Sequence, residues 1–184
     1  LHARFDLSSV VDDPKCHWLI LDGGLKSTRY NFDGFLIYAH IQDLPGYISY
    51  TQIFRNGCVE AVDSYVIGYG SDVQTIHGNI LEKDILVTLD RYLSIQKRLG
   101  VQPPILVGLT LHRVAGFKIT PEGRPYYMLQ PKPIDRKDIV LPEALIEDYG
   151  SDVNGTMKPV FDVMWNASGW PGSESYTKTG QRTL

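Results

Sequence analysis

The dipeptide Asn56-Gly57 constrains the fold of this chain more than any other feature of its sequence. Both residues tolerate positive φ angles, which the two central positions of a type I′ turn require and most residues resist. Two segments that contain β-branched and aromatic side chains flank the dipeptide, residues 50–55 and 58–62. The pattern predicts an antiparallel hairpin with a two-residue loop, in which Phe54 pairs with Val59.

This register assigns the hairpin side chains to two faces, because successive residues of a strand point to opposite sides. Ile53, Arg55 and Glu60 fall on one face, and Phe54 and Val59 fall on the other. We therefore expect Arg55 and Glu60 to form a cross-strand pair on the surface.

A long amphipathic helix is predicted over residues 79–99. Asn79 is a suitable N-cap, and Glu82 follows three residues later, where its carboxylate can reach back to the cap amide. Gly100 suits a left-handed C-cap, and Lys97 suits the negative end of the helix dipole. One apolar stripe recurs at spacings of three and four residues, formed by Leu81, Ile85, Leu89, Tyr92, Ile95 and Leu99.

The remaining predicted elements are strands and one further helix. Strands are expected at residues 16–21, 34–40, 105–111 and 116–119, with the segment 105–111 at the centre of the sheet. Residues 139–146 fit either a strand that ends at Pro142 or a short helix that begins there. A C-terminal helix over residues 156–168 is expected to end at Gly169 and to bury Met157, Val160, Phe161, Met164 and Trp165.

These elements lack the regular alternation of a doubly wound fold. The sequence therefore predicts an α+β fold, with an antiparallel or mixed sheet that contains a tight hairpin and is covered by one long helix and a C-terminal helix. A hydrophobic content of 43% and a charged content of 21% are typical of a globular protein. We expect residues 1–184 to form a single domain of a longer chain, with residues 1–14 as a linker and residues 138–184 as a C-terminal extension packed on the core.

The sequence gives no indication of membrane insertion or export. It contains no apolar run of the roughly 20 residues that a membrane span requires, and no charged segment followed by an apolar leader. The two cysteines, Cys16 and Cys58, show no CxxC spacing. We therefore expect a cytoplasmic protein that does not associate with membranes.

Charge is unevenly distributed along a chain whose net charge is only −3. Residues 113–137 hold six basic and two acidic side chains, and residues 138–175 are mainly acidic. The six basic residues are Arg113, Lys118, Arg124, Lys132, Arg136 and Lys137. If exposed, they predict a surface for phosphate or nucleic acid, where Tyr126 and Tyr127 would stack on bases. If the acidic stretch faces them, they form an internally paired or solvated segment, which is the preferred interpretation.

The candidate catalytic residues lie in the acidic stretch 143–152. Paired carboxylates occur at Glu143, Glu147 and Asp148, where i, i+4 spacing could place two of them on one helix face, an arrangement suited to acid–base or metal chemistry. A solvated acidic face is the preferred interpretation of this stretch. The five histidines are scattered singly and no GxSxG sequence is present, so no metal, no cofactor and no nucleophile is predicted. Residues 22–28 are expected to form a plain turn, because Leu25 replaces the glycine that precedes the lysine of a phosphate-binding loop.

Three segments carry a resemblance to a known family: residues 52–63 (QIFRNGCVEAVD), 141–149 (LPEALIEDY) and 160–169 (VFDVMWNASG). Over about residues 30–170 the chain resembles bacterial and archaeal proteins with an N-terminal Schlafen-type AlbA-like domain, which are described as ATP-binding or transcriptional-regulator-like. The resemblance implies the second domain of a regulatory or defence-type protein. Nucleotide or nucleic-acid association belongs to the AlbA-like domain in that family, and the resemblance transfers no catalytic residue.

The sequence favours a non-catalytic sensing or interaction domain, working through oligomerisation, ligand binding or contact with another domain of its own chain. A nucleic-acid-binding module formed by residues 113–137 is the first alternative. A metal-dependent hydrolase or nuclease that uses residues 143–152 is the second. An enzyme is therefore the less favoured interpretation.

Overall fold

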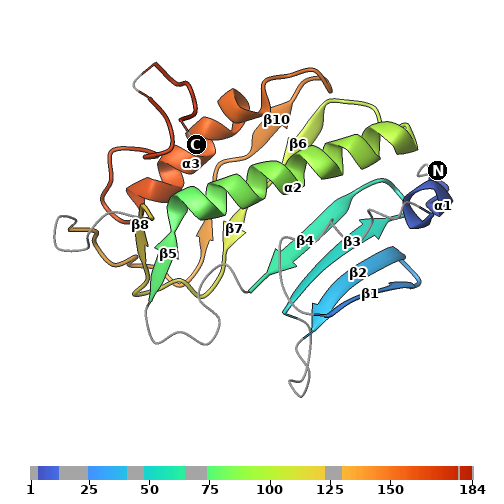
Figure 1. Cartoon of the computed structure of the whole chain (residues 1–184), viewed down its shortest axis with the longest axis horizontal. Coiled ribbons are helices and arrows are strands. Elements are labelled where there is room, and N and C mark those ends of the chain that lie inside the picture. The colour runs from blue at the N-terminus through green and yellow to red at the C-terminus, as the bar shows by residue number, and fades with distance from the viewer. Residues whose placement is uncertain are drawn as a thin grey trace. The chain divides into compact units, whose positions relative to one another are not determined.

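The computed structural model of the chain describes residues 4–12, 25–40, 48–64, 74–122, 130–177 and 179–183 (Figure 1). The contacts group into two compact units. Unit 1 comprises Leu1–Tyr69 and Val87–Gln102, and unit 2 comprises Gly70–Leu86 and Pro103–Leu184. The long helix α2 (Gly78–Leu99) runs through both, since residues 78–86 belong to unit 2 and residues 87–99 to unit 1.

Unit 1 holds a four-stranded antiparallel sheet in the order β1-β2-β3-β4. Its strands are β1 (Leu25–Tyr30), β2 (Gly34–His40), β3 (Ser49–Phe54) and β4 (Val59–Asp63). The predicted α+β fold, with an antiparallel sheet, a long helix and a C-terminal helix, is confirmed. The strand predicted at residues 16–21 lies outside the described residues, and Leu25–Thr28, predicted as part of a turn, belong to β1.

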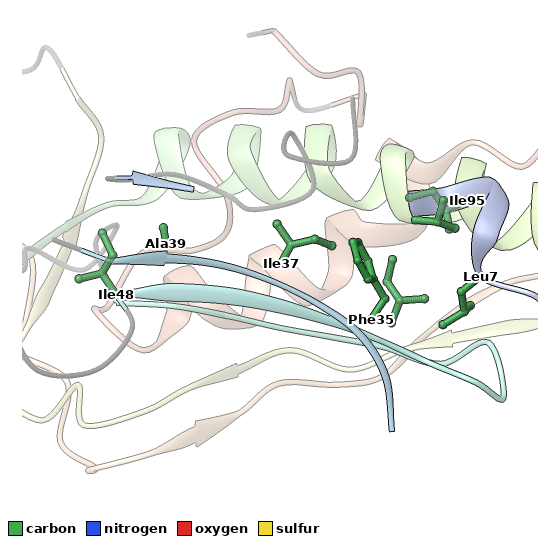
Figure 2. Close-up of a cluster of buried hydrophobic side chains, with 8 residues drawn as sticks. Leu7, Phe35, Ile37, Ala39, Ile48 and Ile95 are labelled. Carbon is green, nitrogen blue, oxygen red and sulfur yellow. The ribbon is translucent and has the colours of Figure 1, made fainter. Parts of the chain in front are cut away.

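The core of unit 1 lies on one face of this sheet, where alternate residues of β2 point toward α2. The cluster consists of Leu7, Val10, Phe35, Ile37, Ala39, Ile48, Ile53 and Ile95 (Figure 2). The short helix α1 (Ser8–Val11) contributes to it, because Leu7 and Val10 are only 2% and 0% exposed. Leu7 and Val10, which lie in the segment predicted as a linker, are therefore part of this core.

The predicted hairpin joins β3 and β4, but its loop has three residues instead of two. Ile53 pairs with Val59, one residue away from the predicted register. The amide of Gly57 donates to the carbonyl of Phe54 at 2.9 Å, and among the three loop residues only Gly57 has a positive φ, of 85°. This geometry is a type I turn followed by a left-handed glycine, so the predicted type I′ turn is wrong.

The change of register also removes the predicted Arg55–Glu60 pair. Glu60 lies opposite Gln52 and accepts a hydrogen bond from the Tyr50 hydroxyl at 2.7 Å. Arg55 belongs to the loop, where its Nε donates to the carbonyl of Phe32 at 3.4 Å. Glu60 therefore bonds within the hairpin to Tyr50, and Arg55 bonds to the loop between β1 and β2.

Helix α2 begins at Gly78, one residue earlier than predicted, and its predicted capping box is wrong. Asn79 lies inside the helix, and its side-chain oxygen accepts the amide of Glu122 at 2.8 Å. Glu82 is buried and bonds to residues far away in the sequence. The predicted C-terminal end is confirmed, because Gly100 has a φ of 81° and the amide of Val101 donates to the carbonyl of Gln96 at 2.9 Å.

Unit 2 is built from paired short strands and helix α3 (Val153–Asn166). Strand β5 (Thr75–His77) pairs in parallel with β8 (Lys118–Thr120). Strands β6 (Ile105–Val107) and β7 (Thr110–Leu111) pair antiparallel with β10 (Ala144–Ile146) and β9 (Ile139–Val140), respectively. Residues 105–111 and 139–146 thus form a two-stranded ribbon, so the segment predicted at the centre of the sheet is one side of this ribbon.

The predicted C-terminal helix is confirmed, although α3 begins three residues and ends two residues earlier than predicted. The five residues expected to be buried in α3 are buried, and the helix is followed by Gly169 with a φ of 82°. Strand β10 packs against α3. Residues 138–184, predicted as an extension packed on the core, supply β9, β10 and α3 and so form much of the core of unit 2. Within the described ranges, no helix is long and apolar enough to cross a membrane.

Candidate functional site

The six basic residues predicted to bind nucleic acid are divided among several places. Lys132 and Arg136 line one pocket. The segments that hold Arg113 and Lys137 lie side by side elsewhere, because the amide of Val114 donates to the carbonyl of Lys137 at 2.8 Å. Lys118 lies in β8. Arg124, together with Tyr126 and Tyr127, lies outside the described residues.

Asp138 holds the turn that displays Arg113 and Lys137. Its Oδ1 accepts the backbone amide of Arg113 at 2.9 Å and lies 3.3 Å from Nδ1 of His112. The amide of Arg113, followed by His112 and the charge of Lys137, lowers the pKa of the Asp138 carboxyl. Arg113 has a φ of 58°, a left-handed conformation that costs about 1 kcal/mol or more for a residue other than glycine. The carboxylate therefore fixes the backbone at Arg113, and the side chains of Arg113 and Lys137 are both exposed.

The acidic residues 143–152 do not form the helix face that their spacing suggests. Glu143 and Glu147 flank strand β10, and the four residue steps of extended chain between them span about 13 Å. That distance is too large for both carboxylates to bind one ion or one reacting group. Among the residues that the structure describes, no group of three or more His, Cys, Asp or Glu side chains could hold a metal ion.

The ribbon presents apolar side chains on its outer face. In β10, Ala144 and Ile146 are buried at 5% and 1% exposure, whereas Leu145 between them is 43% exposed. Leu106 of β6 lies directly opposite Leu145 and is 60% exposed. Strands β6 and β10 run side by side in Figure 1. Two large apolar side chains therefore form an exposed cross-strand pair.

A bulge brings Val140 to the same outer face. Thr110 pairs with Val140, and Val107 pairs with Ala144, so residues 108–109 of one strand face residues 141–143 of the other. The extra residue between β9 and β10 shifts the alternation of inward and outward side chains by one position. Val140 (79% exposed) and Leu145 consequently both point outward, although an unbroken strand would place them on opposite faces.

We call this surface the ribbon face and define it by Leu106, Val140, Glu143, Leu145 and Glu147, all of which are exposed. Glu143 and Glu147 fall on the same side of the strand as Leu145, because they lie two residues before and after it. The ribbon face thus combines an apolar strip with two carboxylates that do not meet. This chemistry suits contact with another surface rather than bond cleavage.

Sequence reasoning missed the apolar part of the ribbon face. An unbroken apolar run such as residues 105–111 is typical of a strand buried on both sides. The apolar Leu145 between Glu143 and Glu147 was a sequence indication of this face. However, residues 139–146 fitted a helix as well as a strand. The face becomes visible only once the pairing partner of residues 105–111 is known.

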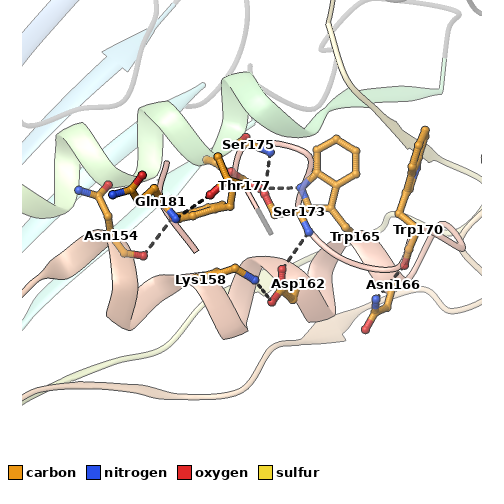
Figure 3. A network of polar contacts seen from close by, with 12 residues as sticks. Asn154, Lys158, Asp162, Trp165, Asn166, Trp170, Ser173, Ser175, Thr177 and Gln181 are labelled. Atoms are coloured by element: carbon orange, nitrogen blue, oxygen red, sulfur yellow. Dashed lines mark hydrogen bonds and ion pairs between the residues drawn. The ribbon is translucent and has the colours of Figure 1, made fainter. Parts of the chain in front are cut away.

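A second group of polar contacts surrounds Glu82, which is fully buried. Its Oε1 accepts hydrogen bonds from Nε1 of Trp165 and from the Ser173 hydroxyl, the latter at 2.6 Å. Asp162 of α3 accepts the amide of Ser173 at 2.9 Å and the ammonium of Lys158 at 2.6 Å (Figure 3). These bonds fasten the segment after α3 to the two helices of unit 2, and their enclosed position indicates a structural role.

Comparisons with known proteins find no relative of this chain. No protein-family model matches the sequence, no curated protein matches it, and no solved structure matches the chain. The function therefore has to be argued from the geometry of the described residues.

Proposed function

We propose that this chain is a non-catalytic interaction domain of a larger regulatory or defence-type protein, and that its ribbon face binds a second copy of the same chain. The exposed cross-strand pair of Leu106 and Leu145 carries the proposal. Each square ångström of apolar surface that such a contact removes from water contributes about 25 cal/mol. Together with Val140, the pair offers three exposed apolar side chains whose burial favours association.

Charge complementarity supports a second copy as the partner. Glu143 and Glu147 give the ribbon face negative charge, and the same chain carries the exposed residues Arg113 and Lys137 on two segments joined by the backbone bond from Val114 to Lys137. Their long aliphatic stems would cover the apolar strip while their charged ends reach the two carboxylates. Because the two surfaces differ, the contact is head-to-tail and builds rings or chains of subunits.

The two alternatives have weaker support. A nucleic-acid surface requires an uninterrupted basic stripe, but Asp138 is bonded to the backbone of Arg113, and Asp135 lies 3.4 Å from Arg136. A hydrolase requires converging carboxylates, but Glu143 and Glu147 flank an extended strand. We place the domain in the cytoplasm, where the exposed free thiol of Cys58 would remain reduced.

The proposal is tested by analytical ultracentrifugation over a range of protein concentrations. We expect reversible self-association that weakens as salt is added, since salt screens exposed charges. The double variant Leu106→Ser/Leu145→Ser should sediment as a monomer. The matched control Val62→Ser/Val87→Ser, which alters side chains 46% and 42% exposed in unit 1, should associate like the wild type.

Charge reversal tests the head-to-tail geometry. Glu143→Lys/Glu147→Lys should abolish association, and so should Arg113→Glu/Lys137→Glu, because each places like charges across the contact. An equimolar mixture of these two variants should associate again, since each contact then joins opposite charges. A wild type that stays monomeric at all concentrations would overturn the proposal, and so would a mixture that stays monomeric although each variant is folded.

A further inference from the structure

A pocket of about 500 Å³ lies in unit 2 beside the C-terminal end of α3. It is lined on one side by Lys132, Asp135, Arg136 and Ile139, and on the other by Val163 and Asn166 of α3. Its volume falls within the range of roughly 300–1,000 Å³ that is typical of small-molecule sites. The ribbon face contributes none of these residues.

The main chain holds this basic segment in place. The amide of Ile134 donates to the carbonyl of Phe117 at 2.8 Å, and the amide of Lys132 donates to the carbonyl of Ser168 at 2.9 Å. Ile134 is 2% exposed and anchors the segment in the core. A Cβ atom built on Gly169 would lie 3.5 Å from Cδ of Lys132, so the lysine stem passes directly over this glycine. The pocket wall is therefore formed before any ligand arrives.

The lining combines two kinds of chemistry. Arg136 and Lys132 supply positive charge, and the nearest carboxylate, Asp135, lies 3.4 Å from Nε of Arg136 in a weak, exposed pair. Ile139 and Val163, the latter 40% exposed, supply apolar surface. An arginine binds phosphate or carboxylate through two parallel hydrogen bonds, which an exposed aspartate with its own hydration does not prevent.

We propose that this pocket binds an organic anion, a small molecule that carries a phosphate or carboxylate group on an apolar body. Arg136 and Lys132 bind the anionic group, and Ile139 and Val163 contact the apolar body. The proposal goes beyond the interaction function, because it assigns a separate ligand site to residues that the ribbon-face contact does not use.

The test is an NMR titration of backbone amides with phenyl phosphate, with benzoate, and with inorganic phosphate and phenol as separate controls. We expect saturable shifts confined to residues 132–139 and 163–169 with phenyl phosphate or benzoate, and the stronger of these two identifies the anionic group. Inorganic phosphate and phenol should bind more weakly, since each offers only half of the recognised chemistry. Titrating the Leu106→Ser/Leu145→Ser variant as well makes the outcome independent of self-association.

Two neighbouring substitutions separate the pocket from general electrostatic attraction. Arg136→Gln should weaken binding about tenfold, the loss expected for one charge-assisted hydrogen bond. Lys137→Gln, made in the Leu106→Ser/Leu145→Ser background so that self-association plays no part, removes the same charge from a residue that does not line the pocket. It should leave the affinity for phenyl phosphate unchanged. Val163→Ser should weaken binding of phenyl phosphate but not of inorganic phosphate.

Equal losses from Arg136→Gln and Lys137→Gln, or shifts that never saturate, would overturn the proposal in favour of diffuse charge attraction. Tighter binding of a single-stranded oligonucleotide, falling steeply with salt and lost equally in both variants, would overturn it in favour of a nucleic-acid surface.

Discussion

At the scale of single residues, two glycines with the same backbone conformation lie in different surroundings. Gly57 and Gly100 have φ angles of 85° and 81°. A Cβ atom at Gly57 would lie 2.5 Å from Cγ2 of Val101 and 2.9 Å from Cε2 of Phe5, whereas a Cβ atom at Gly100 would meet nothing within 4 Å. The hairpin loop is thus packed against the core of unit 1, and the helix end is open.

Substitution of these glycines separates backbone strain from overpacking. Gly100→Ala should lower the free energy of unfolding by about 1 kcal/mol, through the left-handed backbone alone. Gly57→Ala should lower it by about 1–3 kcal/mol more, because neighbouring side chains must also move. Urea denaturation of the two variants measures the difference. Equal losses would show that the space beside Gly57 accepts a methyl group.

Glu82 offers a second residue-scale prediction. Glu82→Gln keeps an oxygen acceptor for Trp165 and Ser173 and should change the stability little. Glu82→Ala leaves both donors without their acceptor and opens a cavity, which should destabilise the protein by about 3 kcal/mol or more. Chemical denaturation at neutral pH compares the two. A loss from Glu82→Gln as large as that from Glu82→Ala would mean that the fold requires the negative charge itself.

At the scale of elements, the segment after α3 is held by Tyr176 as well as by Ser173. The Tyr176 hydroxyl donates to the carbonyl of Asn154 at 3.1 Å, and its ring lies 5.7 Å from the ammonium of Lys158. Burial, and then the charge of Glu82, raises the pKa of Tyr176 to about 12. The folded protein therefore retains this proton at a pH where the unfolded chain has released it.

The raised pKa of Tyr176 predicts a loss of stability in alkali. The unfolded tyrosine has a pKa of about 10, so this contribution is complete below about pH 10 and disappears as the pH rises to about 12. Tyr176→Phe removes it, and the stability difference between wild type and variant should therefore shrink over this range. Urea denaturation at a series of alkaline pH values measures this. A stability difference between wild type and Tyr176→Phe that stays constant over this pH range would contradict the raised pKa of Tyr176.

The elements that were predicted correctly are those whose bounds depend on residues close together in the sequence. The apolar periods of α2 and α3, and the glycines that end them, are local features, and β2 spans the predicted residues 34–40. The errors concern which residues contact one another across strands or between distant parts of the sequence. A three-residue loop and a two-residue loop both accept Asn56-Gly57, and only the burial of Val59 with Ile53 selects between them. Glu82 fitted a capping box because its partner, Trp165, is 83 residues away in the sequence.

At the scale of the whole molecule, α2 is the element common to both units. The division into units was not predictable, because one of its boundaries, between Leu86 and Val87, falls inside a continuous amphipathic helix. The candidate site was predicted only in part. The basic and acidic residues were identified, but the apolar strip that gives them a function depends on the ribbon and its bulge.

A proline at the boundary should weaken both units together. Val87→Pro removes one helical hydrogen bond, clashes with the preceding turn and should cost about 3 kcal/mol or more. Amide exchange should accelerate in β2 and β3 of unit 1 and also in β5 and β8 of unit 2. Val87→Ala, at the same 42% exposed position, should leave exchange nearly unchanged. Acceleration confined to one unit would show that the two unfold independently.

The bulge that turns Val140 and Leu145 to the same side also affects the tendency of the chain to aggregate at high protein concentration. An apolar strip on a two-stranded ribbon is a template on which strands of partly unfolded chains can stack into fibrils. Pro142 interrupts the edge at the bulge, and the charges of Glu143 and Glu147 repel an identical strand laid in register. The carboxylates that favour a basic partner thus also keep concentrated protein in solution.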